Sequence, residues 1–228
     1  MEKENITKDM NGNTKKEIKS DVYNVDCVTF MRELPDKYFD LACADPPYGI
    51  SISSNPVRQA HERKSWDCQV PSKDFFDELF RVSKNQIIWG GNYFGLPPNK
   101  HFLIWDKMQS FDFSLAMCEY AWSSFDSPAK MFRQHVSSNG EKKIHPTQKP
   151  VELYAWIFKN YVKEGETIFD PMVGSGSSRI AAYKFGFDFY GCEIDKDYFD
   201  AQEKRFASEC FGETQMSNGE TVKQLTLF

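Results

Sequence analysis

The chain has 228 residues, of which 40% are hydrophobic and 15% aromatic, which is enough to pack a core and excludes a disordered chain. Its 28 basic and 33 acidic residues give a net charge of −5, which neither supports nor excludes a nucleic-acid partner. No apolar run reaches the roughly 18 residues of a membrane span. The charged residues 1–4 do not resemble a signal peptide, and the six cysteines form no C-x-x-C pair. We therefore expect a cytoplasmic protein without membrane association, zinc site, other metal site or disulfide framework.

Apolar periodicity predicts strands and helices in alternation along most of the chain. Residues 1–20 are polar and are expected to form a mobile arm, and a polar tail is expected from residue 212 onward. Between them, strands are predicted at 22–25, 39–44, 86–89, 102–105, 115–122, 167–169 and 189–191, and helices at 27–34, 75–82, 151–162, 177–185 and 198–206. This alternation indicates an α/β fold with a mostly parallel sheet and helices on both faces.

A glycine-containing loop, residues 170–177, lies between a predicted strand and a predicted helix. Gly174 and Gly176 allow a ligand to approach the backbone, and the helix offers free N–H groups. The third glycine of a dinucleotide motif is missing, and the carboxylate of Asp170 suits a cationic ligand better than a pyrophosphate. Glu193 follows the next strand and is placed to accept the hydroxyls of a ribose. An ordinary turn and a helix cap are the alternatives for these two features.

The segment Asp45-Pro46-Pro47-Tyr48 directly follows a compact apolar strand. The prolines stiffen the turn, so that the Asp45 carboxylate and the Pro46 carbonyl can both accept hydrogens from an exocyclic amine. Such acceptors stabilise the charge that develops when the amine attacks a methyl group, and the Tyr48 ring can stack on a planar base. A rigid turn without chemistry is the alternative. In the later segment 145–150, Thr147 and Lys149 could contact a carboxylate of a ligand, and a polar loop with two prolines is the alternative.

Along the chain the four motifs follow in the order Asp45–Tyr48, 145–150, 170–177 and Glu193. Motifs of these kinds in this chain order resemble the DNA amino-methyltransferases that methylate adenine N6 or cytosine N4. The catalytic motif precedes the glycine loop, as in the β-class (permuted) branch of that family, with a short target-recognition region at about 107–144. The resemblance covers about residues 21–206. It implies a permuted Rossmann-like class I methyltransferase domain at 21–211, whose mostly parallel seven-stranded sheet has one antiparallel strand. The implied cofactor is S-adenosylmethionine (AdoMet).

The resemblance also implies the roles of individual residues. It places the cofactor against Asp26, Thr147, Lys149, Asp170, Gly174, Ser175, Gly176 and Glu193. It makes Asp45, Pro46, Pro47 and Tyr48 the catalytic residues. In this family cytosine enzymes usually carry Ser at the first motif position, so Asp45 favours adenine. The segment 89–94 resembles a stretch near the target pocket.

Double-stranded DNA is the expected substrate, and because a stacked base cannot reach such a pocket, base flipping is implied. The segments 51–72 and 127–150 carry an excess of basic residues and are candidates for phosphate contact. The candidate side chains are Arg58, Arg63, Lys64, Lys130, Arg133, Lys142 and Lys143. Solvated charged loops are the alternative reading. Because the recognition region is short, we expect a short target sequence or a homodimer.

The last residues resemble the Gln-Leu-x-Leu-Phe peptide by which bacterial replication proteins dock on the sliding clamp. Gln224, Leu225, Leu227 and Phe228 would be the docking residues, on a polar tether. An apolar C-terminal strand packed on its own domain is the alternative.

The sequence therefore predicts an AdoMet-dependent, site-specific DNA adenine methyltransferase. The rivals are a cytosine-N4 DNA enzyme, an RNA adenine methyltransferase, an inactive AdoMet- or DNA-binding module, and an NAD oxidoreductase.

Overall fold

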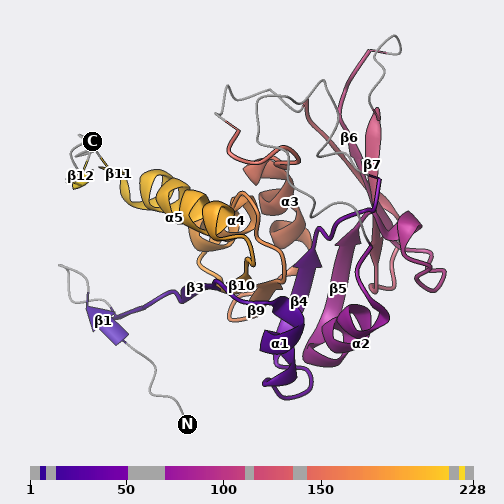
Figure 1. The fold of residues 1–228 in the computed structure, drawn as a ribbon, viewed down its shortest axis with the longest axis horizontal. Helices are drawn as coiled ribbons and strands as arrows, with labels where there is room; N and C mark the ends of the chain where they lie inside the picture. The colour runs from indigo at the N-terminus through magenta and orange to yellow at the C-terminus, as the bar shows by residue number, and fades with distance from the viewer. Residues whose placement is uncertain are drawn as a thin grey trace.

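The computed structural model describes residues 6–8, 14–50, 70–110, 116–135, 143–215 and 221–223. Within them, one sheet contains eight strands in the order β3-β10-β9-β4-β5-β7-β6-β8 (Figure 1). The strands are β3 (Ser20–Tyr23), β4 (Phe39–Ala44), β5 (Ser83–Trp89), β6 (Phe102–Asp106), β7 (Cys118–Ser123), β8 (Lys130–Arg133), β9 (Thr167–Asp170) and β10 (Asp188–Cys192). Only β7 runs antiparallel to its neighbours in this sheet. The expected α/β class and the one antiparallel strand are confirmed.

The sheet has one strand more than the seven expected. The additional strand is β8, which pairs with β6 at the edge of the sheet. Three of its four residues are exposed, and Lys130 and Arg133 stand at its two ends. Charged, short edge strands are a common way to prevent further strand pairing, and they lack the apolar alternation that marks a strand in a sequence.

Helices cover both faces of the sheet (Figure 1). They are α1 (Cys27–Arg32), α2 (Lys73–Val82), α3 (Val151–Tyr161), α4 (Ser177–Phe185) and α5 (Lys196–Phe211). Buried residues of α1 and α2 share a core cluster with Ala42 and Ala44, whereas those of α3, α4 and α5 share another with Leu41 and Cys43. Because side chains alternate along a strand, β4 supplies both cores.

The chain changes direction across the sheet between β4 and β9. From β4 the chain passes through α2 to β5 on one side, and from β9 it passes through α4 to β10 on the other. The two central strands pair in parallel, with Leu41 opposite Ile168, and Phe39 stacks on Phe169 with 4.5 Å between the ring centroids. Parallel sheets form their ligand crevice at the carboxyl ends of the strands flanking such a point. Asp45 follows β4 and Asp170 ends β9, so both predicted motifs lie there.

Smaller elements stand outside this sheet. β1 (Ile6–Lys8) pairs with β2 (Thr14–Lys16), β11 (Glu213–Gln215) pairs with β12 (Thr221–Lys223), and Gly91–Tyr93 form the 3-10 helix η4. The division into arm, domain and tail stays a prediction. Of the helices in the described ranges, none combines the length and the apolar character that a membrane crossing requires.

Candidate active site

A cavity of about 230 Å³ opens at the carboxyl edge of the parallel strands. Its walls come from the segment after β3, the turn after β4, residues 145–149, the glycine loop after β9 and the segment after β10. The predicted site residues that line it are Asp26, Asp45, Pro47, Thr147, Lys149, Gly174, Ser175 and Glu193. The predicted catalytic turn and the predicted cofactor loop therefore share one cavity, although they are far apart in the sequence.

The glycine loop is fixed on both sides. Gly174 and Gly176 have φ angles of 52° and 78°, which side-chain-bearing residues rarely adopt. Arg205 of α5 donates a hydrogen bond to the carbonyl oxygen of Ser175 (2.9 Å) and another to the hydroxyl of Ser177 (2.9 Å). The loop backbone is thus held in a left-handed turn that faces the cavity.

Glu193 connects this loop to the end of β10. Its Oε2 accepts from the backbone N–H of Gly174 (2.8 Å) and its Oε1 from that of Asp195 (2.9 Å). Asp195, and not Glu193, caps α5, because its carboxylate accepts from the N–H groups of the first helical turn. The helix-cap alternative for Glu193 is therefore wrong, and Glu193 lines the cavity. Asp26, which also lines the cavity, caps α1 by accepting from the N–H and hydroxyl of Thr29.

Asp170 lies beneath the loop and is 2% exposed. Burial raises the pKa of this carboxyl to about 7, although hydrogen bonds from the Ser178 hydroxyl and the Met172 N–H oppose the increase. A cation bound nearby would lower this pKa again. The site thus contains a buried carboxyl whose charge depends on what occupies the cavity.

The turn after β4 places Asp45 beside an aromatic group. The Tyr48 hydroxyl donates to Oδ1 of Asp45 (2.8 Å), and the Tyr48 ring stacks on Tyr93 with 5.1 Å between centroids. Gly90, at a φ of +68°, lets the Tyr48 ring approach the backbone, since an added Cβ would stand 2.2 Å from Tyr48 Cε1. The orientation of Tyr48 therefore depends on the segment 89–94.

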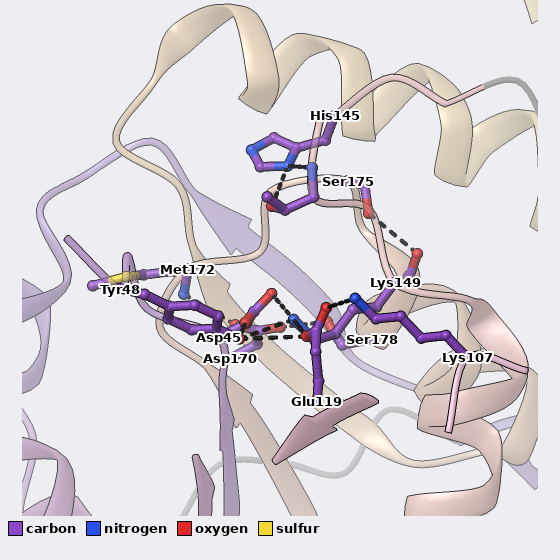
Figure 2. Close-up of polar contacts among 12 residues, drawn as sticks. Asp45, Tyr48, Lys107, Glu119, His145, Lys149, Asp170, Met172, Ser175 and Ser178 are labelled. Atoms are coloured by element: carbon purple, nitrogen blue, oxygen red, sulfur yellow. Dashed lines mark hydrogen bonds and ion pairs between the residues drawn. The ribbon is translucent and has the colours of Figure 1, made fainter. Parts of the chain in front are cut away.

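A buried network of charges surrounds the Asp45 carboxylate (Figure 2). The Lys149 ammonium forms ion pairs with Oδ2 of Asp45 and, at 3.1 Å, with Glu119. Lys107 pairs with the other oxygen of Glu119 at 2.6 Å. Burial raises the pKa of Asp45, with Lys149 opposing it, whereas for Glu119 the two ammonium groups outweigh burial and lower the pKa to about 2. Burial would lower the pKa of Lys149, but the two carboxylates raise it, so this side chain stays protonated.

The comparison with protein families decides the identity. The model of a family described as DNA methylase, whose name specifies N6 and N4, matches residues 86–204, more than half of the chain. The chain belongs to this family. The expectation of an N6/N4 DNA methyltransferase is confirmed at this level, while the choice between adenine and cytosine is not.

Curated relatives of this DNA methylase include two type II methyltransferases. M.BglII of Bacillus subtilis is 23% identical over 89% of this chain and 73% of its own length. M2.DpnII of Streptococcus pneumoniae is 42% identical over 64% of this chain and 50% of its own length, so the methylase spans about half of that relative.

Solved structures share the fold. M1.HpyAVI, in complex with SAM, has a TM-score of 0.55 and 18% identity, and the match covers 83% of this methylase and all of that chain. TTHA0409 of Thermus thermophilus, complexed with AdoMet, has a TM-score of 0.51 and 18% identity, over 82% of this methylase and 95% of that chain. The cytosine-N4-specific PvuII DNA methyltransferase has a TM-score of 0.56 and 11% identity, and the match covers 80% of this methylase and 84% of that chain. The expected Rossmann-like methyltransferase fold is confirmed.

Three residues of the methylase's site were not singled out from the sequence. Lys107 and Glu119 lie within the predicted target-recognition region. The sequence feature that could have identified them is a charged residue inside or directly beside an aromatic-rich strand. His145 lines the cavity, stacks edge-on against Tyr198 (4.4 Å), and its Nδ1 accepts from the Thr147 N–H (3.3 Å). That acceptor role places the proton of a neutral His145 on Nε2.

The predicted DNA-contacting residues divide into two groups. Lys130 and Arg133 lie on the edge strand β8, where they interact with Asn160 and Asp106 respectively, and Lys143 is exposed. Arg58, Arg63, Lys64 and Lys142 lie outside the described residues, as do the predicted clamp-docking residues Gln224, Leu225, Leu227 and Phe228. The DNA and clamp contacts stay predictions.

Proposed function

We propose that this methylase transfers a methyl group from AdoMet to the N6 amine of an adenine flipped out of double-stranded DNA. One observation carries the proposal. Asp45 lines the same cavity as the glycine loop and Glu193, so an amine held by Asp45 would face a cofactor held by the loop.

The residues lining the cavity suit AdoMet, which is the methyl donor. Asp26, Glu193 and Asp195 contribute carboxylates, which disfavour a pyrophosphate but accept hydroxyl groups and attract a cation. When bound, AdoMet supplies a sulfonium-linked methyl group, which forms a bond to the amine nitrogen while its bond to sulfur breaks and the electron pair remains on sulfur. We assign the ribose to Glu193 and the adenine to the Asp26 wall. Thr147 and Lys149 would approach the carboxylate end, and Gly174, Ser175 and Gly176 would supply the backbone surface.

Asp45 would accept a hydrogen from the target amine, together with the carbonyl oxygen of Pro46. The nitrogen gains positive charge as it attacks the methyl group, and a carboxylate already in place stabilises that charge. The bond from Tyr48 holds one oxygen of Asp45, and Pro47 restricts the turn. Because burial raises the pKa of Asp45, this carboxylate can also take the proton that the methylated amine loses.

The target base would lie against Tyr48. One face of that ring is covered by Tyr93, whose side chain belongs to η4 and is 47% exposed. We expect Tyr93 to move aside when the base enters, because an exposed ring is more easily displaced than the buried groups on the other sides. Adenine is preferred to cytosine on the resemblance of the catalytic motif, which begins with Asp45.

The test is transfer of labelled methyl groups from AdoMet to PCR-amplified DNA, followed by nucleoside analysis. N6-methyladenine is the expected product. N4-methylcytosine would replace the proposed base, and no incorporation would contradict the proposal. Asp45→Ala should lower turnover by at least about 10³-fold and retain AdoMet binding. Asp36→Ala, at a side chain 77% exposed, is the matched control and should keep normal turnover.

We further propose that residues 224–228 dock on a bacterial sliding clamp. Deleting them should abolish clamp binding and leave methylation of short oligonucleotides intact. Unchanged clamp affinity after the deletion would end this proposal.

A further inference from the structure

The ion pair between Lys149 and Asp45 poses a problem for the proposed reaction. Lys149 is 3% exposed at its side chain and holds one oxygen of the carboxylate that should receive the target amine. An ammonium group in that position competes for the oxygen and repels the positive charge that develops on the nitrogen. For the amine to bind fully, the Lys149 ammonium group must shift from Asp45 to another carboxylate.

Glu119 is in the position that this shift requires. Its Oε2 already lies 3.1 Å from the Lys149 ammonium, and its Oε1 is held by Lys107 at 2.6 Å. Figure 2 shows Glu119 rising from β7 toward Lys149 and Asp45, with Lys107 on its other side. Lys149 therefore needs only a small movement to exchange Asp45 for Glu119.

The topology explains why Glu119 reaches this point. β7 runs antiparallel to β5, so its first residues lie at the edge where the parallel strands end. Glu119 is opposite Trp105 of β6, and the Lys107 N–H bonds to the carbonyl of Met117, so Lys107 and Glu119 are diagonal neighbours on one face. The one reversed strand thus supplies a charged pair to the catalytic edge.

We propose that Glu119, held by Lys107, is a positioning residue that takes the ammonium group of Lys149 when Asp45 binds the target amine. This inference rests on the proposed function. Two cations and two carboxylates form the network, so moving Lys149 between the carboxylates keeps the buried charges balanced. An unpaired buried charge would be strongly unfavourable, and the exchange avoids one.

Two substitutions should have opposite effects on the acidic limb of the pH–rate profile, which follows the loss of the proton from Asp45. Glu119→Gln removes a negative neighbour and leaves Lys149 entirely on Asp45, so the pKa of Asp45 falls and the limb moves to lower pH. Lys107→Met leaves the charge of Glu119 uncompensated by Lys107, so Lys149 shifts toward Glu119, the pKa of Asp45 rises and the limb moves to higher pH. Other titratable groups near Asp45 are common to both variants; they are Tyr48, Asp170, Cys43 and Tyr154.

The experiment measures single-turnover methyl transfer from AdoMet to PCR-amplified DNA between pH 5 and 9, with AdoMet affinity measured separately. Glu119→Gln should slow the transfer step about 10- to 100-fold, retain AdoMet affinity and move the acidic limb down by about one pH unit. Glu119→Asp should recover part of the rate. The proposal would be overturned if the acidic limbs of Glu119→Gln and Lys107→Met stayed at the wild-type pH, or if they moved in the same direction.

Two further variants separate this role from a purely structural one. Glu119→Gln leaves Lys107 buried without its carboxylate, so the double variant Glu119→Gln/Lys107→Met removes the pair together and should still show the slow rate and the lowered limb. A double variant with the wild-type profile would overturn the proposal. Glu78→Gln is the matched control, since Glu78 is 20% exposed and pairs with Arg81 on α2, against 22% for Glu119. A wild-type enzyme that methylates no DNA would instead contradict the proposed function.

Discussion

Replacing Asp170 by asparagine should remove a pH dependence from the stability of the protein. Burial raises the pKa of this carboxyl from 3.8 to about 7 in the folded chain. Between these two values the folded state binds a proton that the unfolded state has lost, so the free energy of unfolding falls as the pH rises. Asparagine has nearly the same shape and can keep both hydrogen-bond partners, the Met172 N–H and the Ser178 hydroxyl.

The size of the effect follows from the two pKa values. One pKa unit corresponds to about 1.4 kcal/mol, and the interval between pH 5 and 7.5 includes most of the titration of the folded state. Integration over that interval gives a loss of about 2.5 kcal/mol in the wild type that the Asp170→Asn variant should not show. The variant should therefore gain stability relative to the wild type as the pH rises.

Urea unfolding of both proteins at pH 5 and pH 7.5, without cofactor, measures this difference. The quantity of interest is the change in unfolding free energy between the two pH values, compared between the proteins, so the contributions of other carboxyls largely cancel. Asp74→Asn is the control, because Asp74 is 65% exposed and its surface ion pair contributes little. Equal pH dependence in Asp170→Asn and the wild type would refute the reasoning.

Three further predictions concern the backbone, the cofactor and the core. Gly90→Ala should reduce turnover and lower stability by about 1–3 kcal/mol, because the new Cβ would stand 2.2 Å from Tyr48 Cε1; normal turnover in transfer assays would contradict this close approach. Glu193→Ala should weaken AdoMet binding about 10- to 100-fold in calorimetry, since the Gly174 N–H loses its acceptor; unchanged affinity would remove Glu193 from the cofactor site. Leu79→Ala should cost about 2–5 kcal/mol in urea unfolding, because Leu79 is fully buried, and AdoMet affinity should persist; a loss below about 1 kcal/mol would contradict the described core.

The central elements could be predicted closely because their patterns are local. The strand Phe39–Ala44 and the helix Ser177–Phe185 have the predicted bounds, since a compact apolar run, interrupted only by Asp40, marks the strand and flanking glycines mark the helix. The first strand is displaced, from 22–25 to Ser20–Tyr23. The reason is tertiary: the Asn24 side chain donates to the carbonyl of Glu193 (2.7 Å), which turns the chain away from the sheet. A contact between residues so distant in sequence has no local signal.

In the candidate site too, local sequence patterns could be predicted and contacts that depend on the tertiary structure could not. Motif order was enough to place Asp45 and Glu193 in one cavity, because carboxyl ends of parallel strands share an edge. Lys107 and Glu119 could not be placed, since their position depends on the direction of β7 and on its pairing with β6. The direct ion pair of Lys149 with Asp45 also depends on this three-dimensional arrangement, whereas the sequence suggested only a contact with the cofactor.

The pairing of β4 with β9 has a consequence for how such a molecule can be encoded. Backbone hydrogen bonds and the stacking of Phe39 on Phe169 join the half that carries Asp45 to the half that carries Glu193. Neither interaction depends on which half the ribosome makes first. A gene with the two halves exchanged would still encode both partners of this pairing, so the pairing does not by itself fix the order of the segments in the gene.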